Sequence, residues 1–246
     1  MNAIDVTVAL PTWNSAKILW LQLESLCRQK TRFKFEVIVV EDPSENFAGK
    51  DYVLEFSQRI NEAGGELVYI SLPKWIPLGL KWKYIAEAAR GDVYILAASD
   101  NFSSPDRIEV SANAMQHSDW FDVRSGSFYD IHSGRQAHWH CYDLSKTGLF
   151  MATKTKLMLQ LNDNPPKAGI DTWIRECFQQ KIYRSTTEFM DGLHTDGCNT
   201  ISHHRKTLYT THPRFTAIRK SVTEILPEEI YKRLLQIKKE AHAKVA

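Results

Sequence analysis

Acidic residues stand at or just after the ends of largely apolar runs at two places in this chain. Asp100 follows the run at residues 93–98, VYILAA, while Glu41 and Asp42 follow the run at residues 35–40, FEVIVV. A carboxylate at the end of a buried strand can hold a divalent cation, accept hydrogen bonds from a polar ligand, or simply form the turn that follows. The elements that position these carboxylates decide which of the three applies.

Apolar runs and helical periodicity alternate through the first hundred residues. Strands are expected at residues 4–10, 35–40, 66–72 and 92–98, and helices at residues 15–30, 50–62 and 80–90. Strands that alternate with helices form a doubly wound, mostly parallel sheet. Ligands bind such sheets beyond the carboxyl ends of the strands. We therefore expect the segments PTWN, EDPSEN and SDNFSSP on one rim.

The second half of the chain is less regular. Strands are expected at residues 121–131 and 146–154, and a helix at residues 168–181 carries a carboxylate, Asp171, near its start. Residues 227–246 are expected to form an amphipathic helix, because their apolar positions recur on one face. These elements place the chain in the α/β class with a C-terminal helix.

The composition is that of an ordinary globular protein. Hydrophobic residues make up 43% and charged residues 24% of the 246 residues, which is enough to build a sizeable core. There is no long apolar run, and the N-terminus lacks a basic segment followed by an apolar core, so we expect no membrane span and a cytoplasmic location. The four cysteines lack CxxC spacing, which favours reduced thiols.

Charge is distributed unevenly along the chain. Residues 203–246 contain ten Lys or Arg against four Glu, a net charge of +6, whereas the remainder carries −4. A basic tail beside an acidic body suggests an anionic partner. The alternative is a helix with a solvated charged face.

Five segments occur in an order that resembles the family 2 glycosyltransferases, which have the GT-A fold. These segments are VALPTWN, VVEDPSEN, AARGDVYILAASDNFSSPD, GLFMATKTKLM and AGIDTWIRECFQQK. In that family the first two segments end strands, the third carries a metal-binding Asp-x-Asp motif, and the last two belong to the acceptor side. The resemblance extends from about Val6 to Lys181.

The resemblance implies one GT-A domain over residues 1–246, with a Rossmann-like, mostly parallel central sheet flanked by helices. Residues from about 1 to 105 would bind a nucleotide sugar, and residues from about 106 to 205 would form an irregular acceptor and catalytic half. Residues from about 206 to 246 would be a basic helical extension. The implied activity is the inverting transfer of a sugar from a nucleotide sugar, most readily a UDP-sugar, to a hydroxyl acceptor. No obligate protein partner is evident.

The resemblance also implies the residues of the donor site. Asp42 matches a carboxylate that recognises the nucleotide base, commonly through uracil N3–H, and Glu41 would reach the ribose. Pro11, Thr12 and Asn14 would contact the nucleotide through the backbone groups of the first loop.

A metal site is implied at the end of the fourth expected strand. Asp100 matches the last acid of the family motif and would hold the Mn²⁺ or Mg²⁺ that binds the donor diphosphate. The usual first acid is missing, since Ala98 and Ser99 precede Asp100. Ser99 would contact the ribose or a metal-bound water. The histidines that could replace the missing acid are His194, His203 and His204.

Asp171 matches the family's general base, which takes the proton of the acceptor hydroxyl. The glutamate that usually precedes this position is Ile170 here, and Asp171 could instead be a carboxylate favoured by the helix dipole. Trp173 and Arg175 would border the acceptor and diphosphate pockets, and Arg205 would face the diphosphate.

Two clusters allow further interpretations. His132, His138, His140 and Cys141 could bind zinc, although no second ligand pair supports this. A basic, aromatic patch at Lys74, Trp75, Lys81, Trp82 and Lys83 could stack on sugars or bases or bind nucleic acid phosphates. The simpler alternative for this patch is a helix with a core Trp and solvated lysines. For the donor site, we expect Lys83 to contact the nucleotide sugar.

The nature of the acceptor and the activity itself leave alternatives open. The acceptor would be a glycan, or hydroxymethylated pyrimidines in DNA. Because the acid pair is incomplete, the chain could also be a degenerate, non-catalytic binding module. Nucleotidyl transfer is less favoured, since no Gly-rich basic loop follows the first strand to grip a triphosphate.

Overall fold

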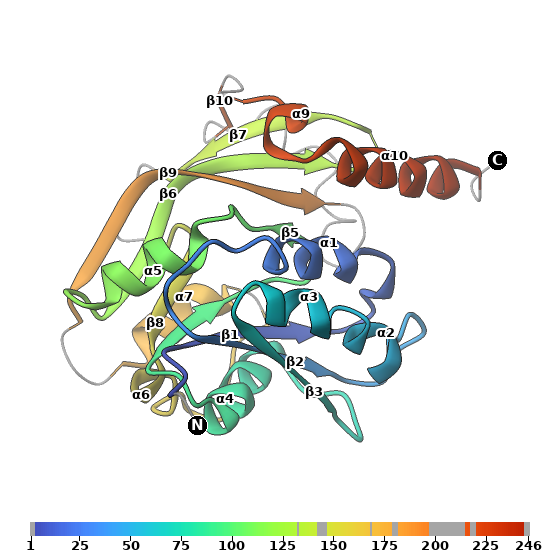
Figure 1. The fold of residues 1–246 in the computed structure, drawn as a ribbon. Coiled ribbons are helices and arrows are strands. Elements are labelled where there is room, and N and C mark those ends of the chain that lie inside the picture. The colour runs from blue at the N-terminus through green and yellow to red at the C-terminus, as the bar shows by residue number, and fades with distance from the viewer. Residues whose placement is uncertain are drawn as a thin grey trace.

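The computed structural model describes residues 3–131, 133–141, 147–167, 169–178, 182–196, 215–216 and 220–243. Ten strands within these residues form one sheet with helices around it, as the α/β class predicts (Figure 1). Its main path runs β10 (Phe215–Thr216), β7 (Gln136–His140), β6 (Trp120–Asp130), β8 (Leu149–Lys154), β4 (Val93–Leu96), β1 (Val6–Thr12), β2 (Phe35–Glu41) and β3 (Gly65–Ser71). Strands β5 (Asn101–Phe102) and β9 (Arg184–Asp196) pair beside this path.

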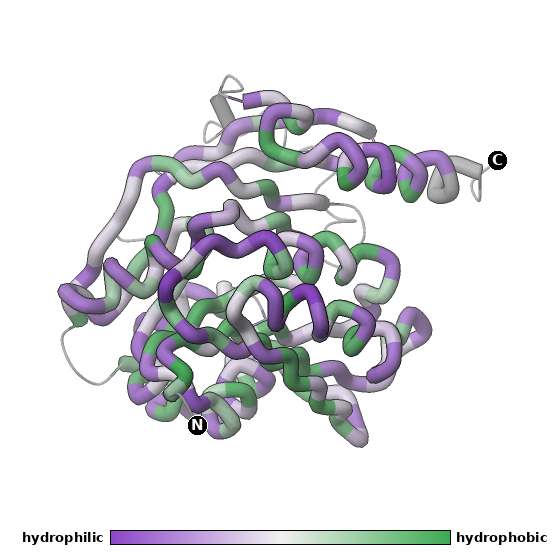
Figure 2. The backbone as a smooth tube through the Cα atoms, viewed as in Figure 1, coloured by the Kyte–Doolittle hydropathy of each residue, from purple (hydrophilic) through white to green (hydrophobic). Residues whose placement is uncertain are grey.

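Strands β1 to β4 form the parallel part of the sheet. β1 pairs in parallel with β2 on one side and with β4 on the other, and β2 pairs in parallel with β3. Every residue of β1 and β2 is buried, as is typical of strands that are covered on both faces. Hydrophobic residues are accordingly concentrated in this part of the molecule (Figure 2). The carboxyl ends of these strands lie side by side at one edge.

Helices cover both faces of the parallel strands. One core cluster contains residues from α1 (Ala16–Leu26), α2 (Lys50–Leu54), α3 (Ser57–Glu62) and α5 (Arg107–Met115). The cluster on the other face contains residues from α4 (Leu78–Ala88), α6 (Thr155–Met158) and α7 (Ile170–Glu176). None of the helices in the described ranges is long and apolar enough to cross a membrane.

Strand β6 organises the second half of the molecule. It pairs antiparallel with β7 and β8 and parallel with β9. The far end of β9 pairs antiparallel with β5, where His194 lies opposite Asn101. This pairing brings residues near 194 next to the chain that follows β4.

The C-terminal helix α10 (Glu228–Ala243) follows the short helix α9 (Val222–Ile225) and packs near α1 (Figure 1). Leu234 is fully buried in the core cluster that includes α1. The Arg233 guanidinium lies 4.1 Å from the centroid of the Trp20 ring, and Arg28 forms a 2.8 Å ion pair with Glu229. The helix therefore packs onto the same hydrophobic core as the N-terminal half, and its basic residue Arg233 takes part in this packing.

The structure departs from the expected elements in several places. The single helix expected at residues 50–62 is divided into α2 and α3, and the helix expected at residues 168–181 is the shorter α7. Helices α5 and α9 and strands β5, β7, β9 and β10 were not expected at all. The sequence of β9, RSTTEFMDGLHTD, is polar and does not alternate cleanly, so its strand conformation comes from pairing with β6 and β5 rather than from a local pattern.

Replacing Leu234 with Ala tests whether α10 is part of the same folding unit. We expect the free energy of unfolding to fall by about 2–5 kcal/mol, because the change opens a cavity in the shared core. Leu235→Ala is the matched control, since Leu235 is partly exposed and should cost less. Urea denaturation measures both variants, and equal losses would contradict the integral role of α10.

Candidate active site

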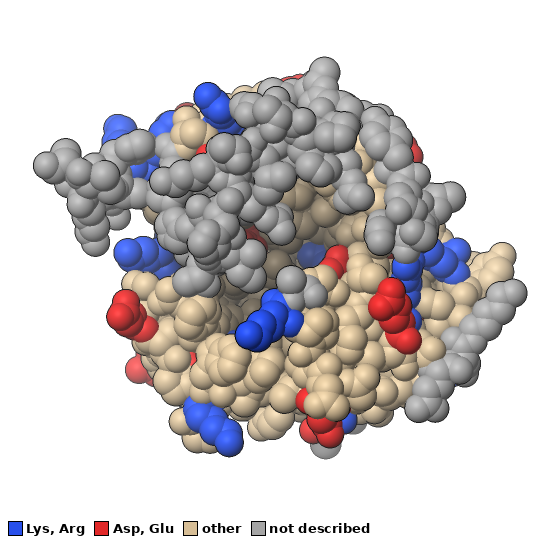
Figure 3. All heavy atoms as spheres, turned by 180° about the vertical axis from the view of Figure 1, so that it is seen from behind, with Lys and Arg blue, Asp and Glu red and all other residues tan. Residues whose placement is uncertain are grey.

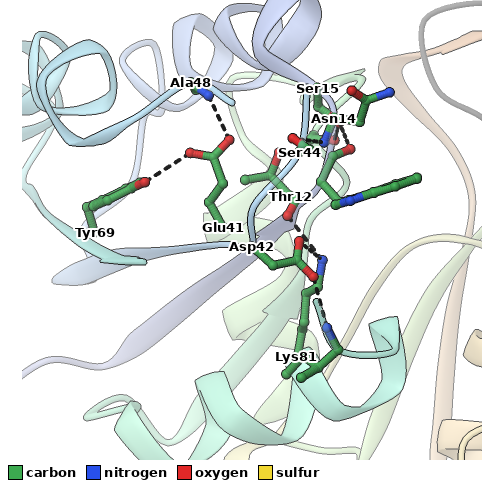
Figure 4. Close-up of polar contacts among 12 residues, drawn as sticks. Thr12, Asn14, Ser15, Glu41, Asp42, Ser44, Ala48, Tyr69 and Lys81 are labelled. Atoms are coloured by element: carbon green, nitrogen blue, oxygen red, sulfur yellow. Dashed lines mark hydrogen bonds and ion pairs between the residues drawn. The ribbon is translucent and has the colours of Figure 1, made fainter. Parts of the chain in front are cut away.

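The carboxyl ends of β1, β2 and β4 bring three predicted loops together, as expected. The first loop follows Thr12, the second follows Glu41, and the turn that carries Asp100 follows β4. Figure 4 shows the side chains of the first two loops with residues from β3 and α4. Pro11 and Thr12 are the last two residues of β1 and are buried.

Asp42 is fully buried and forms an ion pair with Lys81 of α4. The Lys81 Nζ lies 2.6 Å from Asp42 Oδ1 and also donates to the Thr12 carbonyl oxygen at 3.1 Å (Figure 4). The backbone N–H of Ile76 donates to the other oxygen, Asp42 Oδ2, at 3.1 Å. Burial lowers the pKa of Lys81, although the Asp42 carboxylate acts in the opposite direction. One ammonium group thus joins β1, β2 and α4.

Lys81, and not the predicted Lys83, reaches this edge of the sheet. The Lys83 ammonium pairs instead with Asp163 at 2.7 Å on the exposed side of α4. Residues two positions apart on a helix point to different sides, whereas Lys81 shares a face with the buried Ile85 four residues later. Helical spacing could therefore have identified Lys81.

Asn14 ties the first loop to the second. Its backbone has a φ of 55°, in the left-handed region that asparagine tolerates. Its side-chain oxygen accepts hydrogen bonds from the backbone and side-chain nitrogens of Asn46, and its own N–H donates to Ser44 Oγ. One backbone group of the loop predicted to contact the nucleotide, the Asn14 N–H, is thus already bonded within the protein.

Glu41 points away from Asp42 and holds the second loop (Figure 4). Its carboxylate accepts hydrogen bonds from the backbone N–H groups of Ala48 and Gly49, at 2.8 and 2.9 Å, and from the Tyr69 hydroxyl at 3.0 Å. Burial, followed by the bond to Glu41, raises the pKa of Tyr69. Glu41 has no exposed surface, so the expected ribose contact would require the second loop to move.

Asp100 lies in the turn after β4, with 9% of its surface exposed. Its carbonyl oxygen accepts hydrogen bonds from the backbone N–H and the hydroxyl of Thr195, which fixes the turn against β9. The Ser99 hydroxyl donates to Ser15 Oγ at 3.1 Å and connects the turn to the first loop. The turn is therefore held from two sides.

Arg107 of α5 also stabilises the turn that carries Asp100. Its buried guanidinium donates to the Leu96 carbonyl oxygen at 2.6 Å and to Ser103 Oγ at 2.8 Å, so it spans the residues on either side of Asp100. Burial lowers the pKa of Arg107 to about 9. Sequence analysis missed this residue, because nothing local distinguishes it from an ordinary helix arginine.

Of the three histidines considered as metal ligands, the structure describes His194. The His194 ring stacks on Phe128 at 4.8 Å and lies 4.6 Å from Phe150, and burial and the neighbouring Arg107 lower its pKa to about 3. Successive strand residues point to opposite faces, so His194 is directed away from the face of Thr195 that contacts Asp100. We therefore assign His194 to packing and not to a metal site. His203, His204 and Arg205 lie outside the described residues.

A divalent cation at Asp100 would take most of its ligands from the donor. The described part of the chain contains no group of three His, Cys, Asp or Glu side chains that could hold a metal ion. A single carboxylate combined with phosphate oxygens and water is a normal Mg²⁺ environment. Asp100 fits a cation of this kind.

Asp171 lies in the first turn of α7, and its Oδ2 accepts a 2.6 Å hydrogen bond from the Thr147 hydroxyl. Trp173, which was predicted to border the acceptor and diphosphate pockets, packs between α7 and α4. A Cβ on Gly79 of α4 would lie 2.7 Å from the Trp173 ring. Only glycine allows this approach, so Trp173 has a packing role. Arg175 is partly exposed in the last turn of the same helix.

The structure does not bring together the basic, aromatic patch or the zinc-ligand group that the sequence suggested, as far as their residues are described. Trp82 is buried in the core against Tyr94, and Lys81 is buried with Asp42, which leaves Lys74 and the 56% exposed Trp75 outside. The described histidines of the zinc hypothesis belong to no such ligand group, and His132 lies outside the described residues. Seen from behind, the molecule is hollowed near its middle, and the described Lys and Arg of this face lie apart from one another, with acidic side chains among them (Figure 3).

Residues 7–178 match Glycosyl transferase family 2. The chain belongs to this family. A segment of 57 residues is 44% identical to a chondroitin synthase of Escherichia coli. This segment makes up 23% of the chain and 8% of that protein.

Solved structures share the fold of this family 2 chain, and confirm the GT-A architecture. A mannosyltransferase of Pyrobaculum calidifontis, in complex with GDP-Man and Mn²⁺, superposes with a TM-score of 0.57 at 16% identity and covers 83% of this chain and 60% of that one. Residues 1–349 of S. aureus TarS, in complex with UDP-GlcNAc, give a TM-score of 0.52 at 18% identity, with 75% and 59% covered. The chain thus spans less than two thirds of the length of these relatives.

Replacing Lys81 with Met tests the buried ion pair. We expect the free energy of unfolding to fall by about 3–5 kcal/mol, because the Asp42 carboxylate would stay buried without its counterion. Lys83→Met is the matched control on the same helix and should unfold near the wild-type midpoint, since that lysine pairs at the surface. Thermal denaturation compares the two, and an unchanged Lys81→Met protein would argue against the role of the pair.

Proposed function

We propose that this chain transfers a sugar from a UDP-sugar to a hydroxyl acceptor with inversion at the anomeric carbon. The observation that carries the proposal is the environment of Asp42, in a family 2 chain with Asp100 after β4, the strand on the other side of β1. The Ile76 N–H donates to Asp42 Oδ2, and a nucleotide base would place its own N–H there. The enzyme in complex with UDP-GlcNAc among its structural relatives supports a uridine donor.

The base would enter under the segment at residues 73–77. Because Asp42 is fully buried, this segment must shift so that uracil N3–H replaces the Ile76 N–H on Oδ2. Lys81 keeps Oδ1 neutralised throughout. Cytosine presents an acceptor at N3 and would meet the carboxylate unfavourably, so the site discriminates between pyrimidines.

The diphosphate would lie at the turn that carries Asp100. This carboxylate would hold Mn²⁺ or Mg²⁺ together with the phosphate oxygens, and the cation would supply positive charge against the leaving diphosphate. A mannosyltransferase of the same fold binds Mn²⁺ with its donor. Arg107 and Thr195 keep the Asp100 turn in place for this purpose.

Asp171 would act as the general base. The acceptor oxygen attacks the anomeric carbon, its proton passes to the Asp171 carboxylate, and the bond from the anomeric carbon to the phosphate oxygen breaks with its electron pair on the diphosphate. Such a base contributes roughly 10²–10⁴-fold to the rate. The products are the glycosylated acceptor and UDP.

A glycan is the acceptor that the observations favour over DNA. The segment shared with a chondroitin synthase supports a glycan. On the face seen in Figure 3, the described Lys and Arg lie apart from one another and give the phosphates of a nucleic acid no comparable support.

The donor and the base are tested by UDP release from a panel of UDP-, GDP- and CDP-sugars with oligosaccharide acceptors and with hydroxymethylated DNA. We expect turnover with a UDP-sugar and a glycan, and a 10²–10⁴-fold lower kcat for Asp171→Asn with UDP binding retained. Asp163→Asn, a surface change near α4, is the control. Transfer only from a GDP-sugar, only onto DNA, or at full rate by Asp171→Asn would each refute the corresponding assignment.

The role of Asp100 is tested by metal titration. Asp100→Asn should raise the Mn²⁺ concentration needed for half-maximal binding of UDP by tenfold or more, because a charged ligand is lost. The same variant should bind UDP without metal as the wild type does. An unchanged Mn²⁺ dependence, read by calorimetry on both proteins, would rule out Asp100 as the metal ligand.

A further inference from the structure

Thr147 makes a contact with Asp171 that no motif indicated. The Thr147 hydroxyl donates to Asp171 Oδ2 at 2.6 Å, across the space between the start of β8 and helix α7. Within the described residues, the other oxygen, Oδ1, has no hydrogen-bond partner. The two elements otherwise meet through side chains of the core on that face.

The position of Thr147 is set by a buried carboxylate on β6. Asp122 Oδ2 accepts hydrogen bonds from the backbone N–H of Gly148 at 2.9 Å, from Trp120 Nε1 at 3.0 Å and from the Arg184 guanidinium at 2.6 Å. Asp122 has no exposed surface, so these donors hold it firmly. The residue after Thr147 is thereby anchored to β6.

The backbone at Gly148 comes so close to β6 that only glycine fits. A Cβ on Gly148 would lie 2.1 Å from the Val123 carbonyl oxygen. On the other side, the Cys141 thiol lies 3.7 Å from the Thr147 carbonyl oxygen, a weak hydrogen bond. Thr147 is fixed through its own carbonyl and through the next N–H, and its hydroxyl is therefore aimed at Asp171.

We propose that Thr147 is a positioning residue for the general base, an inference that rests on the function proposed for Asp171. Its hydroxyl occupies Oδ2, so that the carboxylate presents Oδ1 to the acceptor hydroxyl and takes the proton there. Asp122 and Gly148 act through Thr147 and touch no substrate. The bond also keeps the carboxylate from rotating away from the acceptor.

Thr147→Val removes the hydroxyl at nearly constant volume. We expect kcat for UDP release to fall roughly tenfold to a hundredfold, the loss of one hydrogen bond to a charged group, while the KM for the donor changes less than about twofold. Thr147→Ser, which restores the hydroxyl, should recover most of the rate. Thr153→Val on β8 is the matched control, since its hydroxyl bonds the Asp119 carbonyl oxygen away from α7.

The double variant Thr147→Val with Asp171→Asn separates positioning from a general loss of structure. If Thr147 acts only through Asp171, the double variant is no slower than Asp171→Asn alone. Additive losses, or a Thr147→Val protein with wild-type kcat, overturn the proposal while the base assignment stands. A fully active Asp171→Asn refutes the proposed function instead. Should Thr147→Val fail to fold by thermal denaturation, Thr147→Ala provides the same comparison.

Discussion

The buried ion pair between Asp42 and Lys81 is the interaction on which the edge formed by the carboxyl ends of β1 and β2 depends. A carboxylate with no exposed surface at the end of β2 is stable only with an ammonium beside it, because an isolated buried charge costs several kcal/mol. The same ammonium reaches the Thr12 carbonyl oxygen. Lys81 thus links the ends of β1 and β2 to α4 electrostatically. The position of the segment at residues 73–77 is set in turn by the start of α4 and by the hydrogen bond from the Ile76 N–H to Asp42.

The parallel half of the fold could be predicted because its signals are local. The run FEVIVV is apolar apart from Glu36, which is typical of a strand covered on both faces, and the strands before and after it alternate with helices of regular period. Parallel strand ends meet at one edge by topology, so Asp42 and the turn of Asp100 were correctly expected there. The short motifs then indicated the family, which the match over residues 7–178 confirms.

The rest could not be predicted because it depends on partners that are distant in sequence. Glu41 accepts a hydrogen bond from the Tyr69 hydroxyl on β3, 28 residues further along the chain, whereas its neighbour Asp42 pairs with Lys81. His194 resembles a metal ligand in sequence, but the pairing of β9 with β5 decides its face and puts its ring between phenylalanines. Strand β9 itself is polar and becomes a strand through β6. In each case tertiary contacts override the local pattern.

The hydrogen bonds of Asn14 have a consequence for how a nucleotide would be received. The first two loops are already joined through Asn14, Ser44 and Asn46, so they form a preorganised wall at the strand ends. When a ligand binds to loops that are already ordered, the protein loses little conformational entropy. More of the interaction free energy then remains as affinity. The movement that nucleotide binding at Asp42 would require is then confined to the segment between β3 and α4, and the contacts between the two loops would stay intact.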